Sequence, residues 1–424
     1  MGTNFEFVRL GDVADFVRGI TFKPEDVVSI DEDDVVACMR TKNIQSELDI
    51  SDVWGLPPRF VRRSDQLLRV GDILVSTANS WNLVGKCCWV PELHWPATLG
   101  GFISALRPVG NKADNRYLYR WFSSDQVQKQ VRKCARQTTN IANLNIEQCL
   151  DLHIPLPEIS EQIRVARLLD HIDRLRRSRA EATLLLGDLL RAHFNNIFGD
   201  PAHNPKNFPS VSLGELIVDG PTNGLYKPAD DYGDGTRILR INNFYDGLVN
   251  DQSTLRRLNL SASEIKKYGL RRNDIVINRV NSREYLGKSA LIPALDEDTV
   301  FESNMMRLRL DERKISPVFC ITFMQTSFIR RQISMMAKDA VNQSSINQSD
   351  VRSLRILLPP IELQRAFDRY AAINDSINIV QSAHRDKLDQ LFVALQQKCF
   401  GSVHITQSDA ANSIFANTAK RAVS

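Results

Sequence analysis

The sequence predicts an α+β protein in which two mixed α/β domains alternate with two long helices that pair as an antiparallel coiled coil. Residue pairs recur at one offset: Asp72-Ile73 returns as Asp274-Ile275 and Gly85-Lys86 as Gly287-Lys288, in each case 202 positions later (274 − 72 = 202). Each copy also ends in a long proline-free stretch whose apolar residues follow helical spacing. Because solenoids need several short repeats, two copies of this size indicate that a whole domain and its helix are duplicated. We therefore expect an internal pseudo-twofold repeat.

The first domain is expected to span residues 1–158 and to mix strands with a helix. Apolar runs at 73–75, 87–90 and 102–106 each follow a turn-forming pair that contains glycine. Short apolar runs between such turn residues predict β-strands. Residues 114–134 predict one helix, because their apolar side chains recur along one face.

Two helical regions are expected, over residues 159–200 and 360–401, with the second domain over residues 201–359 between them. Gly187 is the only glycine inside the first helix, which is therefore either continuous or broken there. A helix of roughly 35 residues is about 50 Å long, and its narrow apolar seam needs a partner helix. The other copy's helix is the natural candidate. The tail at 402–424 is rich in Ser, Ala, Thr and Asn and is expected to be loosely ordered.

Composition is typical of a soluble protein. Of the 424 residues, 43% are hydrophobic and 25% charged; the formal net charge is +4 and the pI about 8.6. This balance permits contact with nucleic acid without requiring it. No apolar run approaches the roughly 18 residues that cross a membrane, and the N-terminus lacks an apolar signal core, so we expect a cytoplasmic protein. Seven scattered cysteines without a Cys-x-x-Cys pair predict reduced thiols.

The motifs of common catalytic sites are missing from the sequence. It contains neither a Gly-x-x-x-x-Gly-Lys-Ser/Thr phosphate loop nor an Asn/Asp-Pro-Pro-aromatic segment that could hold a flipped adenine. The seven histidines are dispersed, and no His-Glu-x-x-His motif occurs. We therefore predict no catalytic residue, no metal site and no cofactor in this chain.

Side chains that suit DNA occur at three corresponding places in the two copies. Base edges are recognised by Arg, Asn and Gln, whereas phosphates are held by Lys, Arg, Ser and Thr. That the same places are polar in both copies favours a functional surface; the alternative is that Asn and Ser only form turns there. The candidates in the first copy are Arg40, Thr41, Lys42, Asn43, Asn79, Ser80, Trp81, Lys86, Arg136, Gln137, Thr138, Thr139 and Asn140. Those in the second copy are Arg240, Asn242, Asn243, Asn278, Arg279, Asn281, Arg283, Lys288, Gln343, Ser344 and Ser345.

The order of these motifs resembles that of the specificity subunits of type I restriction–modification systems. Residues 71–76 followed by Gly85-Lys86 are similar to the family's central strand and turn. Residues 137–145 are similar to the loop before its last domain segment, and Leu156-Pro157 with Glu161-Gln162 is similar to its entry into a conserved helix. The repeated order of all these motifs carries the resemblance.

The resemblance covers residues 5–401, with departures at Asn273, where the family has glycine, and at Leu363, where it has glutamate. It implies that residues 1–158 and 201–359 are target-recognition domains, each of which recognises one half of a bipartite and asymmetric DNA site. The helices would set the length of the unspecified spacer between the half-sites.

The resemblance also implies partner proteins. In the family the helices dock methyltransferase subunits, usually two copies, and the complex then recruits restriction subunits. S-adenosylmethionine, ATP and Mg²⁺ would belong to those subunits. The candidate partner contacts are Gln162, Leu168, Leu169, Leu185, Phe194, Gln364, Tyr370, Leu391 and Leu395. The alternative for the apolar members is that they only close the helix pair.

Two other functions remain open from the residues alone. A two-domain scaffold on a helical rod would share the architecture but bind proteins instead of DNA, and the salt dependence of duplex binding separates the two. A nuclease could use the acidic run 31–34, although such a run is more typical of a solvated loop. Cleavage of plasmid by the purified chain with magnesium would support the nuclease.

Overall fold

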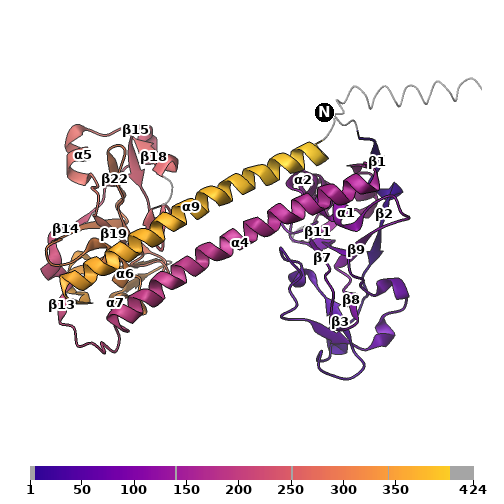
Figure 1. The fold of residues 1–424 in the computed structure, drawn as a ribbon, viewed down its shortest axis with the longest axis horizontal. Helices are drawn as coiled ribbons and strands as arrows, with labels where there is room; N and C mark the ends of the chain where they lie inside the picture. Colours follow the sequence, from indigo (N-terminus) through magenta and orange to yellow (C-terminus); the bar gives the residue numbers. More distant parts are fainter. Residues whose placement is uncertain (1–4, 139–140, 250–251, 342, 402–424) are drawn as a thin grey trace, which may run out of the picture. The chain divides into compact units, whose positions relative to one another are not determined.

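The computed structural model describes residues 5–138, 141–249, 252–341 and 343–401 and divides into two compact units. Unit 1 comprises residues 1–178 and 384–424, and unit 2 comprises residues 179–383. Two long helices, α4 (Ile159–Phe198) and α9 (Ile361–Phe400), run through both units (Figure 1). About half of each helix belongs to unit 1 and the other half to unit 2. Each unit therefore contains one mixed α/β domain and two half-helices. Within the described ranges, no helix combines the length and the apolar composition that a membrane crossing requires.

The centre of unit 1 is a four-stranded antiparallel sheet. Its strands, in spatial order, are β2 (Ala14–Arg18), β9 (Ile103–Pro108), β5 (Ile73–Ser76) and β7 (Cys87–Trp89). All four residues of β5 are buried, as expected for a short apolar run that packs on both faces of a sheet. Asp72, just before β5, forms an ion pair with Arg107 of β9 at 2.6 Å, and both side chains are largely buried.

Smaller elements surround this sheet. The other strands of unit 1 are β4 (Trp54–Leu56), β3 (Val36–Met39) and β8 (Ala97–Leu99) in one sheet, β10 (Ala135–Gln137), β11 (Ala142–Leu144) and β6 (Ala78–Asn79) in another, and the pair β1 (Phe7–Arg9) and β12 (His153–Pro155). The short helices are α1 (Asn115–Phe122), α2 (Asp125–Lys133) and α3 (Ile146–Leu150).

The expectation of one helix over residues 114–134 is wrong, because α1 and α2 are separate helices. Ser124 has extended backbone angles (φ −68°, ψ 144°) and precedes α2 as its N-cap residue. Its Oγ donates to the carbonyl of Trp121 at 2.8 Å. A serine that hydrogen-bonds to the nearby backbone competes with helix continuation, which explains the break. The apolar stripe is still correct, because Tyr117, Trp121 and Val127 all lie in the same core.

The largest sheet of unit 2 repeats the four-stranded order of unit 1 and adds two strands. It contains β14 (Ile217–Asn223), β23 (Met305–Leu310), β19 (Ile275–Asn278), β21 (Ser289–Leu291), β17 (Gly247–Val249) and β16 (Phe244–Tyr245). A second sheet contains β18 (Arg256–Leu258), β15 (Tyr232–Leu239) and β22 (Thr299–Phe301). A third contains β20 (Val280–Asn281), β25 (Gln343–Ser345) and β24 (Lys338–Ala340). The last is the pair β13 (Ser210–Ser212) and β26 (Arg355–Leu357). The helices are α5 (Ala262–Tyr268), α6 (Pro317–Met324), α7 (Ser327–Met336) and α8 (Gln348–Ser353).

Strand register in the two units follows the sequence offset. Ile73 of β5 lies opposite Leu106 of β9, and Ile275 of β19 lies opposite Leu308 of β23, so both partners shift by 202. The ion pair returns as Asp274 with Arg309 at 2.7 Å.

The departure at Asn273 is compatible with the fold. Gly71 has a φ of +93°, and Asn273 at the corresponding position has a φ of +70°. Asparagine tolerates the left-handed region better than most residues with a side chain. The turn therefore keeps its backbone although the glycine is replaced.

The long helices pair antiparallel within each unit, which confirms the predicted arrangement. In unit 2, Asn374 Nδ2 donates to the carbonyl of Leu186 at 3.0 Å, and further along α4 the ring of His193 stacks on Tyr370 at 3.7 Å. In unit 1, Arg176 contacts Asp389. Higher residue numbers on α4 therefore pair with lower residue numbers on α9, as antiparallel helices require. Helix α4 continues through Gly187, and each helix has 40 residues, about 60 Å at 1.5 Å per residue.

The end of each long helix packs into the domain of the other sequence copy. In unit 1 the ring of Phe400, at the end of α9, meets Tyr117 at 5.5 Å. In unit 2 the ring of Phe198, at the end of α4, meets Phe319 at 4.8 Å. Both residues of the second pair are related to those of the first by the offset of 202 (319 − 117 and 400 − 198). Each core therefore needs side chains from both copies of the sequence.

Candidate nucleic-acid interface

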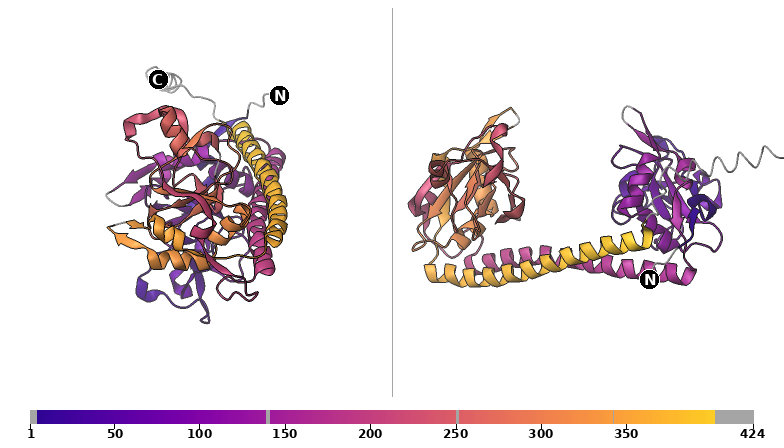
Figure 2. Two further views of the ribbon diagram at one scale, coloured as in Figure 1. Left: turned by 90° about the vertical axis from the view of Figure 1, so that its left-hand side faces the viewer. Right: turned by 90° about the horizontal axis from the view of Figure 1, so that it is seen from above.

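The three predicted places lie next to one another in unit 1. Ala78 of β6 lies opposite Asn143 of β11, so the turn after β5 lies beside the β10–β11 hairpin. Lys86 Nζ donates to Gln45 Oε1 at 2.7 Å, which joins the first loop to this turn. The hairpin projects to the side of the domain that faces away from the long helices (Figure 2). Residues 40–45, 77–86 and 135–138 form the candidate DNA-binding surface of this unit, which we call the DNA face of unit 1.

Unit 2 brings the corresponding places together in the same way. Asn281 of β20 lies opposite Ser344 of β25. Lys288 Nζ donates to the carbonyl of Ile241 at 2.6 Å. Residues 240–246, 278–288, 338–341 and 343–345 form the corresponding candidate surface, which we call the DNA face of unit 2. The convergence was not visible in the sequence, where the three places lie tens of residues apart.

The asparagines Asn43 and Asn243 close the first loop of their unit. The Oδ1 of Asn43 accepts a hydrogen bond from the backbone N–H of Arg40 at 2.7 Å, and that of Asn243 accepts from Arg240 at 2.8 Å. Asn43 is fully buried, and its Nδ2 also donates to the carbonyl of Asp49 at 2.7 Å. A base contact by Asn43 would therefore require the loop to open, whereas Asn242 is exposed.

The basic side chains of the first loops are partly neutralised. Arg40 and Lys42 both contact the carboxylate of Asp52, with 2.9 Å from Arg40 Nη2 to Asp52 Oδ1. The hydrogen bond from Lys42 holds the pKa of Asp52 below its usual value. In unit 2, Arg240 Nε lies 3.1 Å from Glu302 Oε2. These arginines can exchange a carboxylate for a phosphate, because both anions suit the guanidinium fork. Thr41, between the two basic residues, is half-buried.

The asparagines after β5 and β19 shape the following turn. Asn79 Oδ1 accepts from the backbone N–H of Ser80 at 2.8 Å, and Asn281 Oδ1 accepts from Ser282 at the same distance. Asn278 is fully buried, and its Oδ1 has no hydrogen-bond partner among the described residues. Ser80 and Trp81 are exposed at the tip of the first turn. These placements separate side chains that shape the turn from side chains that face outward.

The hairpins offer exposed polar and basic side chains. Arg136, Gln137 and Thr138 are exposed in unit 1, whereas the predicted Thr139 and Asn140 lie outside the described residues. In unit 2, Gln343 is exposed, Ser345 is half-buried, and Ser344 is buried with its Oγ donating to Asp339 Oδ1 at 2.7 Å.

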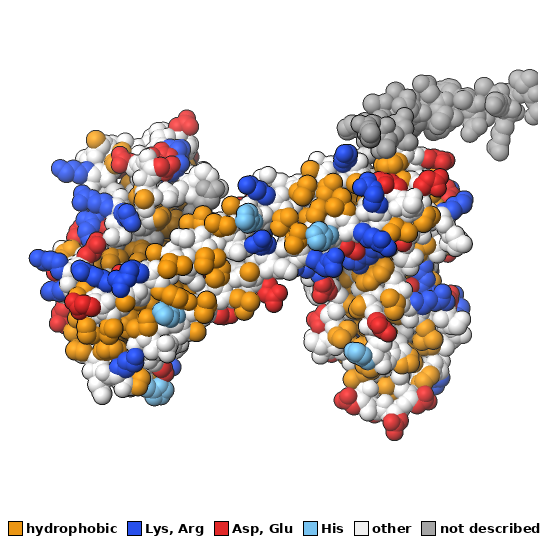
Figure 3. All heavy atoms as spheres, viewed as in Figure 1, with side chains coloured by type: hydrophobic (Ala, Val, Ile, Leu, Met, Phe, Trp, Pro, Cys, Tyr) orange, Lys and Arg blue, Asp and Glu red, His pale blue; other side chains and the backbone are white. Residues whose placement is uncertain are grey.

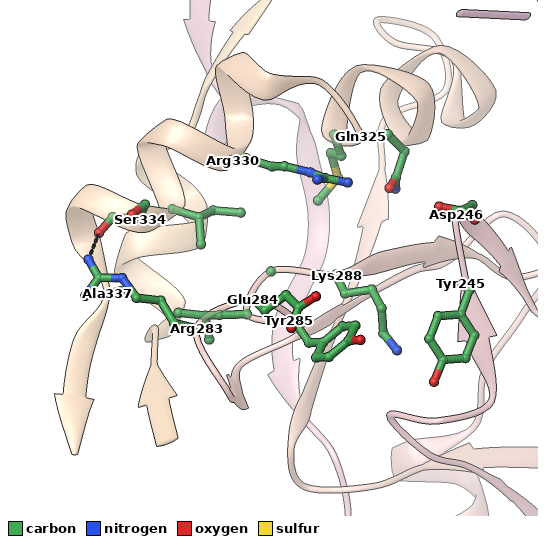
Figure 4. A pocket seen from close by; sticks show the side chains of 14 residues that line it. Tyr245, Asp246, Arg283, Glu284, Tyr285, Lys288, Gln325, Arg330, Ser334 and Ala337 are labelled. Carbon is green, nitrogen blue, oxygen red and sulfur yellow. Dashed lines mark hydrogen bonds between the residues drawn. The ribbon is translucent and has the colours of Figure 1, made fainter. Parts of the chain in front are cut away.

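A cleft of about 390 Å³ opens beside the turn of unit 2 (Figure 4). Lys288 lies in it, half-buried, with its ammonium 3.9 Å from the centre of the Tyr245 ring. Burial lowers the pKa of Lys288. Arg283 closes one end through its ion pair with Asp339 at 2.7 Å and a bond to the carbonyl of Ser334 at 3.3 Å. The neighbouring Arg279 is half-buried and donates to the carbonyl of Ser303 at 3.1 Å.

Sequence reasoning missed several outward side chains of the same surfaces. Leu83 in unit 1 and Glu284 and Tyr285 in unit 2 are exposed at the tips of the two turns. Arg330 of α7 extends over the cleft of unit 2 (Figure 4). The turn residues could have been predicted from the sequence, because they closely follow Trp81 and Arg283. Arg330 could not have been predicted in this way, because it lies on a helix that is distant in sequence.

Gln162 and Gln364 fix the start of each long helix. Gln162 Oε1 accepts from the backbone N–H of Asp114 at 2.8 Å, and its Nε2 donates to the carbonyl of Pro157 at 2.8 Å. Gln364 repeats both bonds, with Ser316 and Pro359 at 2.8 Å each. Both glutamines are fully buried, so in this structure they join helix to domain and do not face a partner.

The remaining candidate partner contacts differ in exposure. Leu169 and Phe194 are buried in the cores, Tyr370 and Leu395 are half-buried, and Leu168, Leu185 and Leu391 are exposed, Leu185 by 60%. Figure 3 shows hydrophobic side chains along the helical surface of each unit. The exposed members leave apolar surface that the helix pair does not cover.

The potential metal ligands in the described part of the chain do not assemble into a site. Within the described ranges, no three His, Cys, Asp or Glu side chains come close enough to hold a metal ion. The acidic run 31–34 is exposed. Burial raises the pKa of Cys38, Cys88 and Cys320 to about 12 each, which disfavours their thiolates.

Sequence comparison relates the chain to one family over most of its length. A family model described as a type I restriction modification DNA specificity domain matches residues 3–183. The StySPI type I restriction enzyme specificity subunit of Salmonella potsdam is 26% identical over 418 residues, covering 92% of this chain and 86% of that protein. The EcoKI specificity subunit of Escherichia coli (strain K12) is 25% identical over 406 residues, with the same coverage of 92% and 86%.

Solved structures share the fold. The S subunit of a type I restriction–modification system from M. genitalium gives a TM-score of 0.61 at 15% identity, covering 95% of this chain and 98% of that one. A chain from a structural study of complex assembly in a type I R-M system gives a TM-score of 0.52 at 18% identity, covering 95% and 99%.

Proposed function

We propose that the chain acts as a type I restriction–modification specificity subunit, like the proteins it is similar to. In this role it recognises a bipartite and asymmetric DNA site, one half with each domain. The supporting observation is that three separate polar segments converge on one surface in each unit and that each surface carries unlike side chains. In unit 1, Lys86 contacts Gln45, whereas in unit 2 Lys288 contacts the ring of Tyr245. Unlike surfaces on a repeated framework recognise unlike half-sites.

The DNA faces carry the groups that both kinds of contact require. Arg136 on the hairpin of unit 1 and Arg330 beside the cleft of unit 2 are exposed cations that suit phosphates. Gln137 and Gln343 are exposed amides that suit adenine. Phosphate contacts position the protein on the duplex, and the amides then distinguish base pairs.

The long helices set the spacer between the half-sites in this proposal. Each helix is continuous over 40 residues, and a continuous helix transmits a fixed length and a fixed rotation along its axis. The hydrogen bonds of Gln162 and Gln364 tie the helix starts rigidly to their domains. The number of residues between the domains therefore determines which spacer length fits.

The exposed apolar residues of the helices dock methyltransferase subunits, two copies by analogy with the repeat. Leu168, Leu185 and Leu391 are the candidates that stay exposed after the helices have paired. Restriction subunits join this complex. The chain itself is non-catalytic, so S-adenosylmethionine, ATP and Mg²⁺ are bound by the partners, and the complex acts on DNA in the cytoplasm.

Co-expression tests the proposal. The chain is expressed with a candidate methyltransferase subunit from the same genome in a host without adenine methylation, and methylated adenines are mapped across the host genome. We expect one motif with two unlike specified halves and an unspecified spacer, absent when either protein is omitted. A continuous motif, or methylation that does not require this chain, would contradict the proposal. Duplex binding that is weak and insensitive to salt would favour the protein scaffold instead.

A further inference from the structure

We infer that the turn after the central strand is a specificity-determining element: residues 81–83 (turn 1) favour A·T pairs, and residues 283–285 (turn 2) favour G·C pairs. This inference rests on the proposed function. It specifies the type of base pair, A·T or G·C, at the position of each half-site that the turn contacts.

The two turns share one backbone frame. The N–H of Val84 donates to the carbonyl of Ser80 at 3.0 Å, and that of Leu286 donates to Ser282 at 3.0 Å. Each turn ends on a glycine with positive φ, +82° in unit 1 and +75° in unit 2. A Cβ on the second of these glycines would lie 2.3 Å from the Cδ1 of Ile333. Backbone and packing therefore fix the frame without using the side chains at the tip.

The tip side chains differ in chemistry although the frame is the same. At the offset of 202, Trp81 corresponds to Arg283, Asn82 to Glu284 and Leu83 to Tyr285. All six are exposed. None of the six belongs to a hydrophobic core, so their chemistry is free to serve a ligand. The exchange replaces an amide and two apolar groups with a guanidinium, a carboxylate and a phenol.

Turn 1 carries the groups that suit A·T pairs. The Asn82 amide forms no hydrogen bond within the described part of the chain, so both its donor and its acceptor are available. Asparagine pairs with the N6 and N7 atoms of adenine, and apolar side chains contact the methyl group of thymine. Trp81 and Leu83 flank the amide and are 40% and 43% exposed, which leaves apolar surface on a face otherwise rich in polar groups.

Turn 2 carries the groups that suit G·C pairs. Glu284 and Arg330 reach the cleft from opposite sides (Figure 4), and neither has an ion-pair partner among the described residues. A carboxylate accepts a hydrogen bond from the N4 amino group of cytosine, and a guanidinium donates hydrogen bonds to O6 and N7 of guanine. An unpaired carboxylate repels phosphates. Its place on this face is explained if it accepts a hydrogen bond from the amino group of a base. Arg283 is already held by Asp339, which leaves Glu284 and Arg330 as the pair that recognises the base pair.

The test uses the full chain with its methyltransferase and maps methylated motifs. Three variants are compared with the wild type: Glu284→Gln, Asn82→Asp, and the triple exchange Trp81→Arg, Asn82→Glu and Leu83→Tyr. Asp298→Asn removes an exposed carboxylate of unit 2 outside its DNA face and serves as the matched control. All substituted side chains are exposed, so thermal unfolding of each variant should match the wild type.

We expect Glu284→Gln to weaken the preference for cytosine at one position of one half-site by about 5- to 150-fold, equivalent to about 1–3 kcal/mol. Asn82→Asp should weaken the preference for adenine at one position of the other half-site. The triple exchange should remove the preference for an A·T pair there, and it supplies no counterpart of Arg330, because Gln128 stands at the offset of 202. Asp298→Asn should leave the motif unchanged. Should a variant methylate too weakly for mapping, competition between duplexes that differ at one base pair gives the same ratio from binding.

Motifs or binding ratios of the variants within twofold of the wild type at every position would overturn the inference. This outcome differs from failure of the proposed function, in which the wild-type complex itself yields no bipartite motif. A change in the wrong half-site, or loss of a G·C pair on substitution of turn 1, would also refute the assignment.

Discussion

Lengthening both long helices by one turn should lengthen the DNA spacer and leave the half-sites unchanged. Four residues would be inserted after Ala180 in α4 and after Ile379 in α9. These positions lie next to the contact between Arg179 and Gln381, whose side-chain atoms are 2.5 Å apart. Because the helices are antiparallel, insertions at facing positions keep the seam in register on both sides. Both sites are exposed, so no core side chain is displaced.

The expected magnitude follows from helix geometry. Four residues add about 6 Å and rotate the helix by about 40° beyond a full turn. Neighbouring base pairs are about 3.4 Å apart and rotated by about 35°. The translation corresponds to nearly two base pairs and the rotation to about one, so we expect the spacer to grow by one or two base pairs. Four residues are half a residue longer than the 3.5-residue repeat of the apolar seam. The two paired helices accommodate this difference by unwinding locally.

Genome-wide mapping of methylated adenines measures the spacer directly. The same four residues inserted in the exposed acidic loop 31–34 serve as the control and should leave the motif as it is. Insertion in α4 alone should misalign the seam and reduce methylation at every site. A double insertion that folds and methylates with the original spacer would refute the reasoning that the helices set this length.

Three further predictions concern single residues. Gln364→Leu leaves the N–H of Ser316 without its buried partner and should lower the free energy of unfolding by about 1–3 kcal/mol in urea titrations; an equally stable variant would show that the junction does not depend on these bonds. Hydrogen bonds from Ser261 and the contact with Lys227 lower the pKa of Glu264 to about 2, so its stabilising contribution is present above its usual 4.5 and lost as pH falls toward 2. Wild-type protein should therefore lose more stability than Glu264→Gln between pH 5 and 2, measured by thermal unfolding, and parallel curves would contradict this. Arg136→Ala should reduce the slope of log affinity against log salt by about 1 in duplex titrations, and an unchanged slope would remove Arg136 from the phosphate contacts.

Much of the framework was predictable because it rests on long periodic patterns. The first helical region was expected at 159–200, and α4 spans Ile159–Phe198. A proline-free stretch with one apolar seam has few alternatives to a paired helix. The central strand β5 was predictable for a related reason, since a short apolar run between turn residues packs only inside a sheet.

Features that depend on distant residues were not predictable. Asp52 neutralises Arg40 and Lys42, but nothing in the sequence pairs a carboxylate with bases 10 and 12 positions away. The repetition of Gln162 was visible, but not its role, because its partners at Asp114 and Pro157 are backbone atoms. The break at Ser124 depends on one side-chain hydrogen bond that competes with an otherwise good helical pattern.

The joints between domain and helix show how far the two copies can differ on one framework. In unit 1 the buried Arg120 bridges two carboxylates of α4, Asp170 at 2.6 Å and Asp173 at 3.1 Å. At the offset of 202 its place is taken by Thr322, and Asp375 replaces Asp173 without the arginine, so burial raises the pKa of this carboxyl. A buried ion network is a weak source of stability but a strong geometric constraint, because each charge must stay paired. Unit 1 therefore fixes its joint partly by charge, whereas unit 2 relies on aromatic packing of α4 against α6, which restricts orientation less.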